Sequence, residues 1–370
     1  MSKRNPLAAW TRLLGRSLQT IARNNLKAGV RAAKKVVRAS TKQGLKAPAR
    51  TLRAAARTPA ARVPNAPSAP AGMAAGAVGA VAGAGGARRF ALYRPPGIAR
   101  SERLPLLVML HGCTQDAAGF ARCTAMNRLA LRERCLVLYP EQDRLSNAQG
   151  CWNWFDTRHG RAAGEAASIL RVINQVMAQH PVDPQRVVVA GLSAGASMAA
   201  LLAMQHPTRF CAVMVHSGVA PGAADSVLTA LRVMRGGRPA AGPAAQVQQL
   251  ATAAALAGVP WPPLLVVHGS ADTLVSPGNG AAAAQLWATA ANAKAGPPRT
   301  VQRGQRYPMT VTDSRCADGR TAVTRVEVAS LGHAWSGGAA GQPFSDAKGP
   351  DASRLLWAFA QRQFRAPTRR

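Results

Sequence analysis

From about residue 89 onward, short apolar runs alternate with segments of helical spacing. Apolar runs typical of buried strands occur at 104–110, 135–139, 186–190, 211–216, 264–268 and 323–330. Segments typical of helices lie at 164–179, 194–205 and 352–364. Strands that alternate with helices predict an α/β fold, with a mostly parallel sheet covered by helices on both faces.

The preceding residues follow a different pattern. Between residues 8 and about 39, apolar side chains recur at spacings of three and four, and basic side chains recur in the same way on another face. From about 47 to 86, Ala, Pro and Gly predominate, as in a linker. We therefore expect a basic helical arm at 1–46, a disordered linker at 47–88 and a globular domain at 89–366.

Charge follows the same division. The first 90 residues contain 18 Lys or Arg and no acidic residue, and the whole chain has a net charge of +32. A polybasic arm attracts anionic surfaces, and phosphate without sequence specificity. The arm is therefore either a solvated tail or a docking segment for an anionic or amphiphilic surface, and no specific nucleic acid is expected.

Six cysteines are present, without a CxxC pair or a Cys/His spacing typical of zinc sites. One or two disulfides are possible on this count, but we expect reduced thiols. No stretch resembles a transmembrane helix, and basic residues interrupt the N-terminus too often for a signal peptide. These features favour a cytoplasmic protein, with export as the alternative.

The strongest chemical signal is Gly191-Leu192-Ser193-Ala194-Gly195, which directly follows an apolar strand and precedes an Ala-rich helix. A G-x-S-x-G sequence in this context forms a strained strand-to-helix turn that exposes the serine hydroxyl. Glycine is needed on both sides because neighbouring backbone crowds the turn. Ser193 is therefore the predicted nucleophile.

A serine nucleophile needs a base, and the base needs an orienting carboxylate. In folds with this turn, the chain order is serine, then acid, then histidine. His333 lies in a loop after the last predicted strand, whereas His206, His216 and His268 lie at a helix end or at strand ends. Asp272, in the loop after 264–268, is the predicted acid; weaker rivals are Asp225, Asp313 and Asp346.

Two further groups complete the predicted site. The oxyanion hole would use the backbone N–H groups of Ala194 and of Cys113, in the loop after 104–110. The Cys113 side chain would be a buried thiol or half of a disulfide. Trp152, Trp154 and Trp335 are either core residues or apolar walls for an acyl chain. No metal ligand set and no cofactor is predicted.

Several segments together resemble the polyhydroxybutyrate (PHB) depolymerase family of esterases, which has the α/β-hydrolase fold. The matching pieces are residues 110–115, 139–142, 151–155, 191–195, 216–218 and 331–338. The resemblance implies that Ser193, Asp272 and His333 hydrolyse ester bonds of poly(3-hydroxybutyrate) or its oligomers through an acyl-enzyme. Within the family, the chain looks closer to the intracellular forms that have no polymer-binding domain. The basic arm could then dock on PHB granules.

Two alternatives remain open. The related feruloyl and acetylxylan esterases share the fold and triad, so the substrate could be an ester on plant polysaccharide. The second alternative is a granule- or nucleic-acid-associated protein with a vestigial hydrolase domain, which the basic arm motivates. Residues 222–260, rich in Ala and Gly, are the expected place for a lid or cap.

Overall fold

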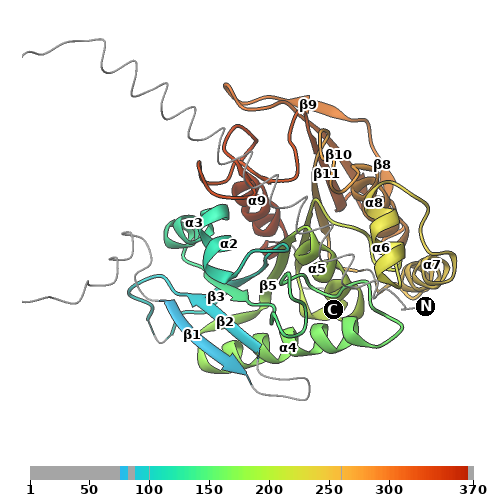
Figure 1. Cartoon of the computed structure of the whole chain (residues 1–370). Helices are drawn as coiled ribbons and strands as arrows, with labels where there is room; N and C mark the ends of the chain where they lie inside the picture. Colours follow the sequence, from blue (N-terminus) through green and yellow to red (C-terminus); the bar gives the residue numbers. More distant parts are fainter. Residues whose placement is uncertain (1–75, 82–87, 100, 260, 366–370) are drawn as a thin grey trace, which may run out of the picture.

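The computed structural model describes residues 76–81, 88–99, 101–259 and 261–365 (Figure 1). The basic arm predicted at 1–46 and most of the predicted linker lie outside these residues. The strands are β1 (Gly76–Val81), β2 (Arg88–Tyr93), β3 (Leu104–Leu110), β4 (Leu136–Pro140), β5 (Val182–Leu192), β6 (Ala212–His216), β7 (Leu264–Gly269), β8 (Lys294–Ala295), β9 (Arg299–Val301), β10 (Met309–Arg315), β11 (Thr321–Val328), β12 (Trp335–Ser336) and β13 (Ser345–Asp346). The helices are α2 (Ala117–Thr124), α3 (Met126–Glu133), α4 (Arg161–Gln179), α5 (Ala194–Gln205), α6 (Val227–Met234), α7 (Ala241–Leu256), α8 (Gly278–Ala290) and α9 (Ala352–Phe364), with a 3₁₀ turn at Pro207–Arg209.

One large sheet organises the described part of the chain, in the order β1-β2-β4-β3-β5-β6-β7-β11-β10-β8, with β9 on β10. Its six central strands, from β4 to β11, pair in parallel, and the strands added at both edges pair antiparallel. Every residue of β3, β4, β6 and β7 is buried. Continuous apolar runs of this kind arise where helices cover both faces of a parallel sheet, which confirms the predicted α/β class.

The helices pack in two groups against the sheet (Figure 1). Helix α5 contacts α4 and strands β3, β5 and β6, whereas α9 contacts α3 and strands β5, β6 and β7. Helix α5 is apolar on all sides, with ten buried residues, because it lies in the interior. None of the described helices is long and apolar enough to cross a membrane.

The segment Gly76–Val81, which we assigned to the linker, forms the edge strand β1 and pairs antiparallel with β2. Its small residues carry little apolar signal, but backbone pairing does not require large side chains. Residues 222–260, the expected lid or cap, contain α6 and α7 between β6 and β7. Strand β5 and helix α4 also begin a few residues earlier than the apolar pattern indicates.

Candidate active site

Ser193 lies at the turn between β5 and α5, with φ 57° and ψ −121°, a strained backbone conformation. A Cβ atom on Gly191 would lie 2.4 Å from the carbonyl carbon of Gly195. A Cβ atom on Gly195 would lie 2.1 Å from the carbonyl oxygen of Leu110 in β3. Both glycines are therefore required by close backbone approach, as the sequence indicated, and the turn holds Ser193 at the carboxyl end of the sheet.

The structure pairs His333 with Asp272. The Nδ1 atom of His333 lies 2.8 Å from Oδ2 of Asp272. The other carboxylate oxygen, Oδ1, accepts hydrogen bonds from the backbone N–H groups of Leu274 (3.0 Å) and Val275 (2.9 Å). Burial acts to raise the pKa of Asp272, but electrostatic attraction to His333 and hydrogen bonds from His268 and His333 outweigh it, so the pKa is lowered. Asp272 is thus held as a carboxylate.

Sheet order explains why residues far apart in sequence meet here. Ser193 follows β5, Asp272 follows β7 and His333 follows β11, and only β6 intervenes between β5 and β7 in the sheet. Because these strands are parallel, their carboxyl ends lie at one edge, where sites of α/β sheets are found. Nε2 of His333 is buried without a hydrogen-bond partner in the described chain, so Ser193 Oγ does not yet bond to it. Nucleophile–base contacts are often looser before substrate binds.

The rival acids have other partners. Asp225 accepts hydrogen bonds from Arg158, and Asp313 pairs with Arg299 and Thr324. Asp346 lies in β13 and caps the backbone N–H of Lys348. None of these three carboxylates forms an ion pair with a histidine in the described residues.

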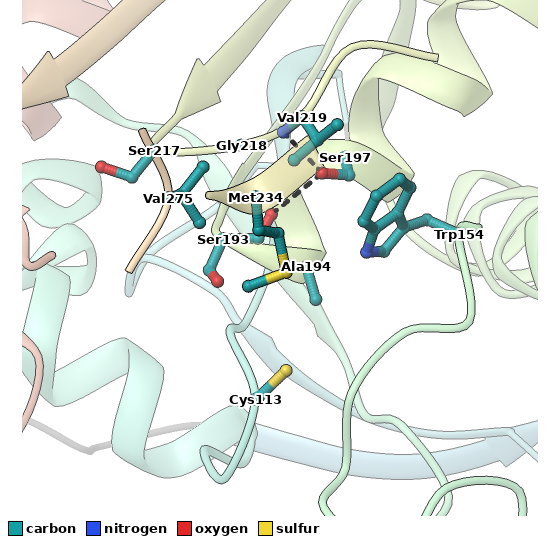
Figure 2. Close-up of a pocket in the computed structure, with 10 residues that line it drawn as sticks. All are labelled: Cys113, Trp154, Ser193, Ala194, Ser197, Ser217, Gly218, Val219, Met234 and Val275. Atoms are coloured by element: carbon teal, nitrogen blue, oxygen red, sulfur yellow. Dashed lines mark hydrogen bonds between the residues drawn. The ribbon is translucent and has the colours of Figure 1, made fainter. Parts of the chain in front are cut away.

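The two residues predicted to supply oxyanion-hole N–H groups, Cys113 and Ala194, both line the pocket that contains Ser193. Ala194 is the first residue of α5, so its N–H has no acceptor within the helix. Cys113 lies in a tight turn after β3, where Gly112 N–H donates to Gln115 Oε1 (2.9 Å) and Thr114 has φ 64°. Both Cys113 and Ala194 line the pocket with Ser193 (Figure 2). The arrangement can place two donors on a developing oxyanion.

The Cys113 side chain forms a disulfide with Cys151. The expectation of reduced thiols is therefore wrong for this pair, while Cys123, Cys135, Cys211 and Cys316 form no disulfide within the described residues. The two cysteines are 38 residues apart, in the loops after β3 and after β4, and these strands are neighbours in the sheet. The disulfide links the turn at Cys113 covalently to the aromatic segment 151–155.

The pocket is narrow, with about 290 Å³ of space when its open mouth is included. Of the three predicted tryptophan walls, only Trp154 lines it. Trp152 is fully buried and donates to the carbonyl of His111 (3.0 Å); Trp335 is also fully buried, and its ring stacks on His216. The prediction that Trp152 and Trp335 contact substrate is wrong, because core packing and their own hydrogen bonds enclose both indole rings.

Other pocket residues were not identified from the sequence. They are Ser197, Ser217, Gly218, Val219, Met234 and Val275 (Figure 2). Ser197 Oγ accepts a hydrogen bond from the N–H of Val219 (2.9 Å). Ser217 and Gly218 belong to the segment 216–218 that resembles the family, and Met234 lies inside the segment expected to form a lid or cap, whereas Ser197, Val219 and Val275 belong to no motif.

A buried polar network, also missed, supports the wall that carries Trp154. Glu165 accepts hydrogen bonds from the backbone N–H (2.8 Å) and Nδ2 (2.6 Å) of Asn153 and from Nε2 of Gln142 (2.6 Å). Arg88 donates to Oε1 of Gln142, and its guanidinium lies over the Trp152 ring. Burial raises the pKa of Glu165 despite these bonds. The network fixes Asn153, between the core tryptophan and the pocket tryptophan.

No cluster of three metal-ligating side chains occurs among the described residues. A serine at a strained turn and a histidine hydrogen-bonded to a carboxylate are groups that acyl transfer by a serine nucleophile requires.

Comparison with known proteins agrees with this chemistry. Residues 88–293 match the family described as esterase PHB depolymerase. Poly(3-hydroxyalkanoate) depolymerase C of Paucimonas lemoignei is 35% identical over 176 residues, which cover 47% of this chain and 42% of that protein. Feruloyl esterase B of Thermothelomyces thermophilus is 30% identical over 187 residues, covering 50% and 64%. The chain therefore spans less than two thirds of either relative.

Among solved structures, an acetyl xylan esterase from Aspergillus awamori superposes with a TM-score of 0.54 at 19% identity, covering 70% of this chain and 94% of that chain. At that identity the likeness concerns the fold, which is the α/β-hydrolase fold of esterases. The family match covers more than half of the residues and includes Cys113, Cys151, Ser193 and Asp272. The chain belongs to the PHB depolymerase family of esterases.

Proposed function

We propose that the chain is a serine esterase that hydrolyses poly(3-hydroxybutyrate) or its oligomers through an acyl-enzyme. The observation that carries the proposal is the His333–Asp272 hydrogen bond at the sheet edge that holds the strained Ser193. Family membership supports the substrate class, because a relative is a poly(3-hydroxyalkanoate) depolymerase.

The chemistry divides into two halves. Asp272 holds the proton of His333 on Nδ1, which leaves Nε2 to accept the proton of Ser193 as its Oγ attacks the ester carbonyl. The N–H groups of Cys113 and Ala194 stabilise the oxyanion. His333 then protonates the leaving hydroxyl, and an acyl-enzyme remains. Water that gives its proton to His333 releases the 3-hydroxyacyl product and restores Ser193.

The test compares the purified full chain with Ser193→Ala on amorphous PHB granules, with 3-hydroxybutyrate release as the readout. Ser101→Ala serves as a matched control, because Ser101 is exposed and outside the pocket. We expect release by the wild type and the control and none by Ser193→Ala. Equal release by all three proteins would refute the assignment of the nucleophile.

The second candidate substrate is an acetyl or feruloyl ester on plant polysaccharide. Similarity to a feruloyl esterase B and to probable acetylxylan esterase A of Aspergillus clavatus supports it. Acetate release from acetylated xylan, with no 3-hydroxybutyrate release from PHB, would favour this alternative. Absence of Ser193-dependent hydrolysis of every ester tested would favour the vestigial-hydrolase alternative.

The Cys113–Cys151 disulfide bears on the compartment. Disulfides persist in oxidising compartments and are rare in the reducing cytoplasm. This feature supports export, the alternative to the cytoplasmic expectation. Cell fractionation, together with labelling of free thiols under denaturing conditions, tests it: a blocked Cys113–Cys151 pair in an exported fraction supports export, and six free thiols in the cytoplasm contradict it.

The basic arm at 1–46 could bind a PHB granule or another anionic surface, since it combines an apolar and a basic face. Removal of residues 1–75 would then reduce granule association while p-nitrophenyl ester hydrolysis in solution stays unchanged. Unchanged granule association would refute docking by the arm.

A further inference from the structure

Helix α6 links two loops that flank the pocket. It begins after the N-cap residue Ser226 and ends at Met234, whose side chain lines the pocket together with Trp154 (Figure 2). Met234 and Trp154 therefore form walls that come from two different segments of the chain. The width of the pocket depends on how α6 is held relative to the segment that carries Trp154.

The carboxyl end of α6 is attached to the loop of the catalytic acid. The backbone N–H of Ser276 donates to the carbonyl of Met234 (2.7 Å), and Nδ2 of Asn279 donates to the carbonyl of Val233 (2.9 Å). Ser276 follows Val275, which lines the pocket, and lies four residues after Asp272. This end of the helix is thus fixed by one backbone and one side-chain hydrogen bond to the segment 275–279.

The amino end of α6 is attached to the aromatic segment by an ion pair. Asp225, just before the N-cap, accepts hydrogen bonds from Nε (2.9 Å) and Nη2 (2.6 Å) of Arg158 at Oδ2, and from Thr229 Oγ1 (3.0 Å) at Oδ1. Arg158 lies four residues after Trp154. The Asp225 side chain is 7% exposed, and that of Arg158 is 65% exposed.

Because the Asp225 side chain is buried, this ion pair differs from an ordinary surface ion pair. Exposed ion pairs stabilise little, because both ions are already well hydrated. The Asp225 carboxylate, by contrast, is shielded from water and would lose its charged partner if Arg158 moved away. Attraction to Arg158 also contributes to the lowered pKa of Asp225, against the effect of burial. The position of Arg158 therefore determines where the amino end of α6 lies.

We propose that the Arg158–Asp225 ion pair restricts the enzyme to short acyl chains by holding α6, and with it Met234, against the segment that carries Trp154. The inference rests on the proposed esterase function. The pocket is small, because its space amounts to only about 290 Å³ even when the open solvent at its mouth is counted. A small displacement of either wall would admit acyl chains with additional methylene groups. Each methylene group changes the ratio of kcat/KM between two substrates roughly tenfold or more.

The test measures kcat/KM of the full chain for p-nitrophenyl acetate, butyrate and octanoate. In Arg158→Gln and Asp225→Asn we expect the butyrate-to-octanoate ratio to fall about tenfold, with acetate hydrolysis changed less than twofold. The double variant should match either single variant, because both remove one interaction. Arg158→Lys retains the charge but cannot place two nitrogens on one oxygen, so its ratio should be intermediate.

Two controls separate pocket width from general destabilisation. Arg354→Gln removes a more exposed ion pair, Arg354–Asp351, at the start of α9, where the two side chains are 67% and 29% exposed, and should leave the ratio unchanged. Met234→Ala widens the pocket directly and should lower the ratio. An unchanged ratio in both Arg158→Gln and Asp225→Asn, while Met234→Ala lowers it, would overturn the inference. Wild-type protein without Ser193-dependent hydrolysis of all three esters would instead overturn the proposed function.

Discussion

Replacing Asp272 with asparagine tests whether the carboxylate sets the tautomer of His333. Oδ1 of Asp272 accepts two backbone N–H groups, those of Leu274 and Val275. An asparagine must keep its carbonyl oxygen at that position, so its amide NH₂ would occupy the position of Oδ2, 2.8 Å from Nδ1 of His333. His333 would then accept at Nδ1 and carry its proton on Nε2, where it cannot take the proton of Ser193.

The expected loss of kcat follows from this change in the tautomer of His333. A base in the wrong tautomer costs a serine hydrolase about 10⁴-fold in kcat, or roughly 5 kcal/mol of activation free energy. Little change in folding is expected, since the side chain keeps its volume and its two backbone bonds. The assay is kcat for p-nitrophenyl butyrate, with thermal unfolding measured in parallel.

Asp346→Asn is the matched control, because Asp346 is a rival acid whose carboxylate caps a backbone N–H away from His333. It should retain kcat within about twofold. The reasoning fails if Asp272→Asn retains kcat within tenfold of the wild type, or if Asp346→Asn loses as much as Asp272→Asn.

Three further predictions concern stability and the pocket. Cys151→Ser should lower the free energy of unfolding by roughly 4 kcal/mol, from the entropy of a 38-residue loop, in denaturant titrations; a loss below about 1 kcal/mol would contradict a formed disulfide with Cys113. Trp152→Ala should cost about 3–5 kcal/mol in the same titration, whereas Trp154→Ala should mainly raise KM for longer acyl esters, and the reverse pattern would contradict their placement. Burial, with the nearby His268 and His333, lowers the pKa of His216 to about 3, so the unfolded state binds the extra proton between pH 6.5 and 3. Stability should therefore fall as the pH decreases through that window, by roughly 5 kcal/mol at most, and His216→Gln should flatten the decline; an equal slope in both proteins would refute this assignment.

Features that depend on chain order were accessible from the sequence. Buried parallel strands appear as unbroken apolar runs, so the central sheet could be predicted from the pattern of apolar residues along the chain. The turn at Ser193 could be recognised because two glycines are imposed by backbone crowding. The order of serine, acid and histidine predicts a pairing of Asp272 with His333, and the structure places their side chains 2.8 Å apart.

Features that depend on contacts across the sheet were not accessible. Two cysteines 38 residues apart become partners only because β3 and β4 are neighbours. The sequence does not distinguish Trp152 from Trp154, although the Trp152 side chain is buried in the core and the Trp154 side chain lines the pocket. Glu165 lies on α4 without a visible partner in sequence, because Asn153 and Gln142 reach it from another loop. Such contacts leave no periodicity in the sequence.

The disulfide between Cys113 and Cys151 also changes how the protein would respond to a protease. The loop it encloses contains Leu145, whose side chain is 96% exposed, next to the exposed Arg144. Exposed loop tips are preferred sites of proteolytic nicking. A single cut there would leave the two fragments covalently joined, with the oxyanion turn still fastened to the tryptophan wall. Such a nicked molecule would migrate as one band without reductant and as two bands after reduction.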